Sequence, residues 1–113
     1  MGRPPRTAAD RDTMKAVGKR LRWVREALGR SQEAMASSVG VHQTAWSLYE
    51  RGLRFPDEFA AVRLMAKLKI SRAYLLEERL EGVERELAIR LAALHPELAP
   101  PIGKEPRTGT GPS

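Results

Sequence analysis

Cysteine is absent from the 113 residues of this chain, and its absence excludes several kinds of chemistry. Without thiols the chain has no disulfides, no cysteine-based zinc-finger ligand set and no thiol nucleophile, which fits a reducing cytosol. The two histidines, His42 and His95, have no neighbouring histidine or cysteine with which to share a metal ion. We therefore expect no metal site and no cofactor.

Long apolar runs and catalytic motifs are also missing. No run of about 18 apolar residues, the length that indicates a membrane-spanning helix, occurs in the sequence, and the N-terminal MGRPPRTAAD has no apolar signal core. There is no Gly-rich phosphate loop and no coherent Ser/His/Asp set. We expect a cytoplasmic protein without a membrane span or export signal, and one that is not an enzyme.

Basic residues, in contrast, are plentiful and unevenly placed. The net charge is +6; residues 1–75 carry 15 Lys and Arg against 7 Asp and Glu, whereas residues 76–113 carry 5 against 7. A basic domain attracts phosphate backbones and releases their counterions. Nucleic acid is therefore the leading class of partner, and an anionic membrane surface is the lesser one.

Apolar residues recur at helical spacing and predict an all-α fold. Residues 1–12 read as a flexible basic arm, and residues 13–79 as a domain of five helices, because no segment alternates with period two. Glycines end the first three helices, and Ser31, Asp57 and Ser71 are the predicted N-caps of the second, fourth and fifth. The apolar residues that define the fourth helix are Phe59, Val62, Leu64, Met65 and Leu68.

A run of leucines continues the helical pattern beyond Leu76. Leucine or valine recurs every three or four residues up to Leu98, nearly as a heptad seam, with an interruption at Gly82. Residues 80–95 are interpreted as a C-terminal helix and residues 96–113, rich in Pro and Gly, as a disordered tail. The helix either folds back onto the domain or pairs with a second copy. We favour dimerisation, through Leu80, Val83, Leu87, Leu91 and Leu94.

Residues 31–52 have the spacing of a helix-turn-helix. The motif begins with a polar residue in the first turn, Gln32, followed by a small residue, Ala36, and a turn glycine, Gly40. Two core anchors, Trp46 and Tyr49, come next, and the intervals between the five residues are four, four, six and three. The small residue permits close approach where the two helices cross. On the second helix, residues 42–51, one side is expected to be core, at Ala45, Trp46 and Tyr49, and the other is short, polar and uncharged until its end.

These segments resemble the lambda-repressor/Cro-like (XRE-type) helix-turn-helix DNA-binding family. The resemblance covers about residues 14–78, through VGKRLRWVREALG, RSQEAMASSVGV, HQTAWSLYERG and FPDEFAAVRLMAKLKISRAYLL. It implies a compact five-helix bundle whose third helix enters the major groove of double-stranded DNA. Family members commonly bind two half-sites, which implies a homodimer on an inverted repeat with half-sites about 34 Å apart.

The resemblance also implies roles for single residues. The base-facing positions are Gln43, Thr44, Ser47 and Leu48; the phosphate-facing positions are Gln32, Arg51 and Arg54. Arg25 and Glu50 match a pair that forms a salt bridge between the first helix and the end of the third. Chemistry agrees, because a glutamine amide suits adenine and a thymine methyl would give an exposed leucine an apolar partner.

Three positions depart from the family pattern. Arg30 replaces an apolar residue, His42 stands where Ser or Thr often caps the third helix, and Trp46 is larger than the usual anchor. Trp23 lies off the main apolar stripe of the first helix, and we expect it to pack against a neighbour. None of these departures removes the predicted fold.

The resulting hypothesis is a small, dimeric, sequence-specific transcriptional regulator, and more specifically a repressor, because no separate activation or ligand domain is visible. Two alternatives use the same fold. In the first, the chain is the antitoxin of a toxin–antitoxin pair, and the C-terminal helix or tail holds a small toxin protein. In the second, it is a protein-interaction adaptor whose helix-turn-helix no longer binds DNA.

Overall fold

Helices account for most of the chain in the computed structural model, which describes residues 2–3 and 7–98. The predicted all-α class is confirmed. The helices are α1 (Ala8–Leu28), α2 (Gln32–Val39), α3 (Gln43–Glu50), α4 (Glu58–Leu68), α5 (Arg72–Glu77) and α6 (Arg85–Leu94). Two short strands, β1 (Gly2–Arg3) and β2 (Phe55–Pro56), pair antiparallel, although the sequence predicted an arm and a loop there.

The first helix begins earlier than the sequence predicted. Thr7 is its N-cap, and the threonine Oγ1 accepts a hydrogen bond of 3.0 Å from the backbone N–H of Asp10. Asp10 adds a negative charge in the first turn, where the helix dipole favours it. Residues 8–12, assigned above to the flexible arm, are therefore helical. Residues 1 and 4–6 of that arm lie outside the described part of the chain.

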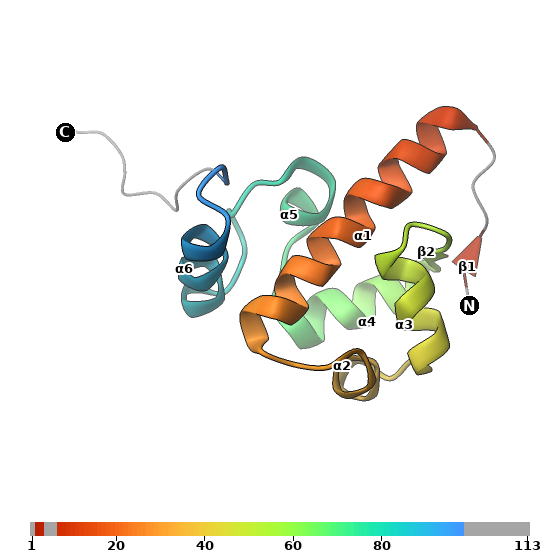
Figure 1. The fold of residues 1–113 in the computed structure, drawn as a ribbon, viewed down its shortest axis with the longest axis horizontal. Helices are drawn as coiled ribbons and strands as arrows, with labels where there is room; N and C mark the ends of the chain where they lie inside the picture. The colour runs from red at the N-terminus through yellow and green to blue at the C-terminus, as the bar shows by residue number, and fades with distance from the viewer. Residues whose placement is uncertain (1, 4–6, 99–113) are drawn as a thin grey trace, which may run out of the picture.

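α1 crosses the molecule with α3 on one side and α6 on the other (Figure 1). Gly18 lies in the middle of α1, where glycine is otherwise unfavourable. A Cβ atom at this position would lie 2.6 Å from the carbonyl oxygen of Glu50 and closer still to that of Tyr49. The absence of a side chain at Gly18 therefore allows the end of α3 to press against α1.

α2 and α3 form the predicted helix-turn-helix. Ser31 caps α2, because its hydroxyl oxygen accepts a 3.0 Å hydrogen bond from the N–H of Ala34. Gly40 ends the helix at φ 76°, in the left-handed region that favours glycine, and its N–H bonds back to the carbonyl of Ala36. Ala36 itself is buried in the core, which confirms its assignment to the packed side of the motif.

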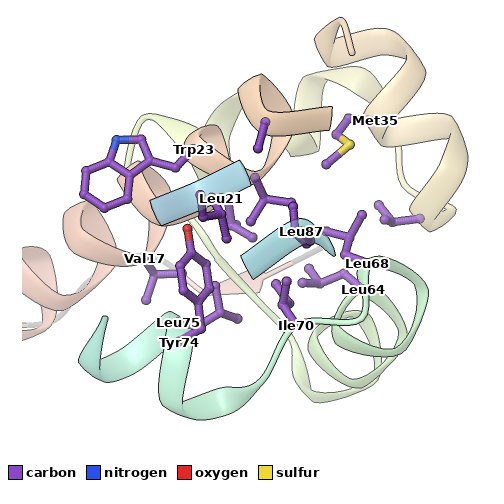
Figure 2. Packing of buried hydrophobic residues seen from close by; sticks show 14 of the residues in the cluster. Val17, Leu21, Trp23, Met35, Leu64, Leu68, Ile70, Tyr74, Leu75 and Leu87 are labelled. Atoms are coloured by element: carbon purple, nitrogen blue, oxygen red, sulfur yellow. The ribbon is translucent and has the colours of Figure 1, made fainter. Parts of the chain in front are cut away.

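A single hydrophobic core joins all six helices of the described residues and the C-terminal turn. Figure 2 shows part of it, with side chains from α1, α2, α4, α5 and α6 directed toward a common interior. Arg20 of α1 adds a polar connection to the end of α5, where its Nη2 lies 3.0 Å from a carboxylate oxygen of Glu78. Tyr74 donates its hydroxyl to the carbonyl of Arg20 at 2.7 Å. These contacts hold α5 along α1.

α4 packs through Leu64, Met65 and Leu68 as the sequence predicted, but not through the other two residues of the predicted set. Its buried residues are Ala60, Leu64 and Leu68. Phe59 and Val62, which the apolar pattern predicts on the packed face of this helix, are 83% and 65% exposed. Asp57 caps the helix as predicted, and Ala60, whose N–H donates to the Asp57 carboxylate at 2.8 Å, is buried in the first turn in place of Phe59.

The C-terminal leucine seam packs within the chain. The continuous seam predicted from Leu76 is broken, because α5 ends at Glu77 and α6 begins only at Arg85. Four of the five residues assigned to dimerisation contribute to the chain's own core, namely Leu80, Leu87 and Leu91, which are buried, and Val83, which is half-buried. Only Leu94, at 54% exposure, faces away. The preference for the seam as a dimer interface was therefore wrong, and the fold-back alternative is the observed one.

Residues after α6 belong to the fold further than expected. Leu98 is buried in the core, and its N–H donates to the carbonyl of His95 at 2.9 Å. Residues 96–98 are thus part of the packed structure and not of a tail, whereas residues 99–113 lie outside the described part. Trp23 is buried as expected, with its ring stacked on His95 at a centroid distance of 3.9 Å. None of the helices within residues 7–98 has the length and apolarity to cross a bilayer.

Candidate nucleic-acid interface

The two sides of α3 differ as the sequence predicted. Ala45, Trp46 and Tyr49 are buried against the domain. On the opposite side Gln43 and Thr44 are exposed, and Ser47 and Leu48 are half-buried. The residues assigned to base contact therefore share the outer face of one helix, and their donors and acceptors stay available because the inner face carries the packing. Three of these four side chains are polar and uncharged, which suits the donor and acceptor edges of base pairs.

The inner end of α3 is held by a buried carboxylate, Glu50. The ion pair predicted with Arg25 of α1 is present in bidentate form, with Nε at 2.6 Å and Nη2 at 3.1 Å from the two carboxylate oxygens. Gln32 of α2 donates its amide to Glu50 at 3.0 Å, and the Trp46 indole N–H donates at 2.5 Å. One carboxylate therefore connects three helices.

The charge on Glu50 is sustained by these donors. Burial alone would raise the pKa of Glu50, but the hydrogen bonds from Arg25, Gln32 and Trp46 outweigh it and hold the pKa below its ordinary value. The guanidinium of Arg25 in turn has a raised pKa, because Glu50 accepts its hydrogen bonds. The group is thus a fully charged and satisfied cluster, which is the condition under which a buried ion pair is tolerated.

Gln32 has a structural role that its position in the sequence did not predict. It was assigned to a phosphate contact, yet its amide nitrogen is directed at Glu50. The Trp46–Glu50 hydrogen bond and the close approach at Gly18 were also missed. Spacing offered a signal for each, because Trp46 and Glu50 are four residues apart on a helix and a glycine inside a helical pattern often marks close packing.

The start of α3 is capped more weakly than the other helices of the domain. His42 is the N-cap residue, and its side chain makes no capping hydrogen bond, as the departure from Ser or Thr predicted. The first N–H groups of a helix have no partner within that helix, and they point along the axis with a positive partial charge. An anion at this end of α3, next to Gln43 and Thr44, would be favoured.

Basic side chains lie at the other end of α3. Arg51 is exposed at the C-cap, and Arg54 is half-buried in the segment that leads to β2. Arg30 is exposed at the start of α2, with its Nη1 3.3 Å from the hydroxyl of Ser38. Cations next to an uncharged reading face are suited to contacts with the phosphate backbone beside a groove. Among the described residues no group of His, Cys, Asp and Glu could hold a metal ion.

One comparison with known proteins identifies the domain that contains α2 and α3. No curated protein and no solved structure matches the chain. The model of a helix-turn-helix domain family matches residues 16–77, more than half of the chain, and spans α2 and α3 together with most of α1 and all of α4 and α5. Such a domain suggests a DNA-binding regulator, and the match is consistent with the lambda-repressor/Cro-like resemblance. The chain belongs to the helix-turn-helix domain family.

Proposed function

We propose that the protein is a sequence-specific transcriptional regulator that places α3 in the major groove of double-stranded DNA. The observation that carries this proposal is the pairing of a polar outer face, with Gln43 and Thr44 exposed and Ser47 half-buried, with an inner face fixed to α1 and α2 through Glu50. A reading helix has to be held rigidly, because base discrimination depends on hydrogen-bond geometry. No catalytic role is part of this proposal.

Base reading is assigned to the outer residues of α3 and backbone binding to the flanking cations. Gln43 would present its amide donor and acceptor to adenine, and the half-buried Leu48 would meet a thymine methyl group. Arg51 and Arg54 would neutralise phosphates. Gln32 would donate to a phosphate through the second N–H of its amide, because only one hydrogen bond to Glu50 is made. Repression is the favoured mode of regulation, because a protein bound at a promoter is enough to block transcription from that promoter.

A homodimer follows from the small size of the reading surface. Four side chains on one helix can read only a few base pairs, and each good contact discriminates by about 1 to 3 kcal/mol. Two copies on an inverted repeat double that discrimination, with half-sites about 34 Å apart. The antitoxin alternative loses support for α6 as the toxin-binding element, because the apolar face of α6 packs against the chain's own core. Residues 99–113 of the tail, the other element that would hold a toxin, lie outside the described residues.

Selection of bound duplexes from a random pool tests the proposal most directly. We expect enrichment of one sequence with two inverted half-sites. On that sequence Gln43→Ala should lower affinity by the equivalent of about 1 to 3 kcal/mol and relax the preference at one base pair. Recovery of no preferred sequence, or an equal loss on every duplex, would rule out base reading by this residue.

The phosphate contacts are tested by salt dependence. Arg54→Ala should weaken specific and random duplexes alike and reduce the salt slope of log affinity by about one. Arg85→Ala is the matched control, because it removes the same charge from the start of α6, across α1 from α3 (Figure 1). Equal slopes for the two variants would remove Arg54 from the interface.

A further inference from the structure

Six basic residues lie on α1, and they differ in whether an acidic side chain neutralises them. Four form ion pairs of 2.6 to 3.8 Å with carboxylates, namely Lys19, Arg20, Arg22 and Arg25. The other two, Arg11 and Lys15, are exposed and have no ion-pair partner in the described part of the chain. The unpaired positive charge of α1 is therefore concentrated in its N-terminal half.

The turn that follows α3 lies directly on α1 at Lys15. Gly52, in this turn, has a φ of 72°. A Cβ atom at Gly52 would lie 2.7 Å from the Cα of Lys15 and 2.9 Å from its Cγ. Gly52 follows Arg51, the exposed C-cap residue of α3. The stem of Lys15 therefore passes the end of α3, and its charged group reaches solvent on this side of the molecule.

Helical spacing places Arg11 on the same side of α1. Residues 11, 15, 18 and 25 are separated by four, three and seven, so they form one stripe along the helix. Gly18 adjoins the last carbonyl groups of α3, and Arg25 pairs with Glu50. The stripe therefore faces the end of α3. Arg11 lies one turn beyond Lys15, where the N-terminal half of α1 continues past α3 (Figure 1).

The cations beside the end of α3 form one positively charged surface, the cationic edge. Its members, none of which has an ion-pair partner among the described residues, are Arg11, Lys15, Arg51 and Arg54. Asp10 and Asp12 are near in sequence, but successive residues of a helix are turned by about 100°, so these acids lie to either side of the stripe. Like charges that are gathered without counter-charges repel one another, and an anionic partner relieves that repulsion.

We propose that Lys15 and Arg11 bind phosphates of the duplex that α3 reads, so that the backbone-binding surface extends from the end of α3 onto α1. The inference rests on the proposed function, because the cationic edge is continuous with the reading face through Arg51. Lys15 reaches a phosphate next to that arginine. Arg11 lies about 6 Å further along the axis of α1 and reaches DNA beyond the end of the reading helix. Such contacts add affinity and fix orientation without reading bases.

The main test is the salt dependence of binding to a random duplex, measured on the full chain by fluorescence anisotropy. Lys15→Ala should reduce the slope of log affinity against log salt by about one, which makes the loss of affinity between about 50 and 200 mM salt about 3.5-fold smaller. Lys19→Ala is the matched control, because it removes the same charge one turn further along α1, where Glu78 already pairs with it at 3.2 Å. An unchanged slope for Lys15→Ala, or an equal reduction by Lys19→Ala, would overturn the proposal.

Two further substitutions separate the charge of Lys15 from its packing on Gly52. Lys15→Met keeps an unbranched stem and removes the charge, so its slope should match that of Lys15→Ala. Lys15→Arg keeps the charge and should retain the wild-type slope. A methionine variant with the wild-type slope would overturn the phosphate contact, as would an arginine variant that loses it.

Arg11 is tested on duplexes of different length. On a selected half-site with long flanks, Arg11→Ala should reduce the salt slope by about one. Trimming the flank at one end should remove this difference from the wild type, because the phosphate lies outside the base pairs that α3 reads. Lys15→Ala should keep its effect on the duplexes trimmed at either end. An effect of Arg11→Ala that survives both trims, or that is absent from the long duplex, would overturn its placement.

The same measurements separate this inference from the proposed function. A chain that binds random duplexes with a slope that depends on Lys15, and that selects no preferred sequence, would support the cationic edge and refute sequence-specific reading. A preferred sequence that Lys15→Ala binds with the full wild-type slope would refute the contact on α1 alone. A wild-type chain that binds no duplex would refute both.

Discussion

Two helices are attached to opposite sides of α1 by different kinds of interaction. α3 buries apolar residues as well, but it is additionally fixed by a buried charge, Glu50, which accepts hydrogen bonds from Arg25 of α1 and Gln32 of α2. α6 is held by buried leucines, such as Leu87 and Leu91, and by the stack of Trp23 on His95. Directional hydrogen bonds fix one orientation, whereas apolar burial is roughly proportional to area and tolerates small shifts. The helix proposed to read DNA has the more exacting attachment.

The largest effect is expected from removing the buried charge of the α3 attachment. Glu50→Ala leaves Arg25 desolvated and without its partner, which should lower the free energy of unfolding by about 3 to 5 kcal/mol. Glu26→Ala is the control, because this residue pairs with Arg22 at 3.8 Å on the surface, with both side chains 48% exposed. Glu26→Ala should lower the free energy of unfolding by only about 0 to 1 kcal/mol. Denaturant unfolding measures the free energy of both variants. If both changes are small, the Glu50 cluster does not stabilise the attachment of α3.

The apolar attachment of α6 is tested by Leu91→Ala. This side chain is fully buried, so its truncation should lower the free energy of unfolding by about 2 to 5 kcal/mol. Ile89→Ala on the same helix is the control, because it is 51% exposed, and it should change stability by less than about 0.5 kcal/mol. If Leu91→Ala instead left stability unchanged and dissociated a dimer, the seam would pair between copies after all.

Acid should distinguish the two attachments. The pKa of Glu50 lies below its ordinary value of 4.5, so the folded chain binds fewer protons there than the unfolded chain does. The stabilisation by Glu50 is therefore complete above that ordinary value and is lost as pH falls through the lowered one. The penalty of Glu50→Gln, measured by denaturant unfolding, should shrink over that window. The penalty of Leu91→Ala should stay constant, because no titrating group is removed.

Most of the helix-turn-helix was predictable because its signals are local. Ser31, Asp57 and Ser71 are capping residues whose side chains accept from nearby N–H groups, and Gly40 ends α2 in the conformation that glycine favours. Such interactions depend on neighbours in the sequence. The burial of Ala45, Trp46 and Tyr49 followed from helical periodicity, and the Arg25–Glu50 pair from the family resemblance.

The errors came from interactions that sequence spacing does not encode. The same seam of leucines can pack within the chain or between copies, and only the three-dimensional course of residues 78–84 brings Leu87 and Leu91 onto α1. Phe59 and Val62 match a helical apolar spacing, but the side of α4 that packs inward is set by the elements around it, and both residues face outward. Gln32 was assigned by its position in the family and not by the carboxylate that lies beside it.

The smallest expected effect concerns the one aromatic contact in the α6 attachment. His95 stacks on Trp23, and its buried Nε2 has no hydrogen-bond partner in the described part of the chain. His95→Phe keeps the stack and removes the unsatisfied nitrogen, so its melting temperature should equal or exceed that of the wild type. His95→Ala removes the ring. Its free energy of unfolding should fall by about 0.5 to 1.5 kcal/mol more than the loss of buried apolar area alone would cause. If the phenylalanine variant is as unstable as the alanine variant, a polar contact of His95 contributes to stability. The attachment of α6 would then also depend on a polar interaction, as the attachment of α3 does.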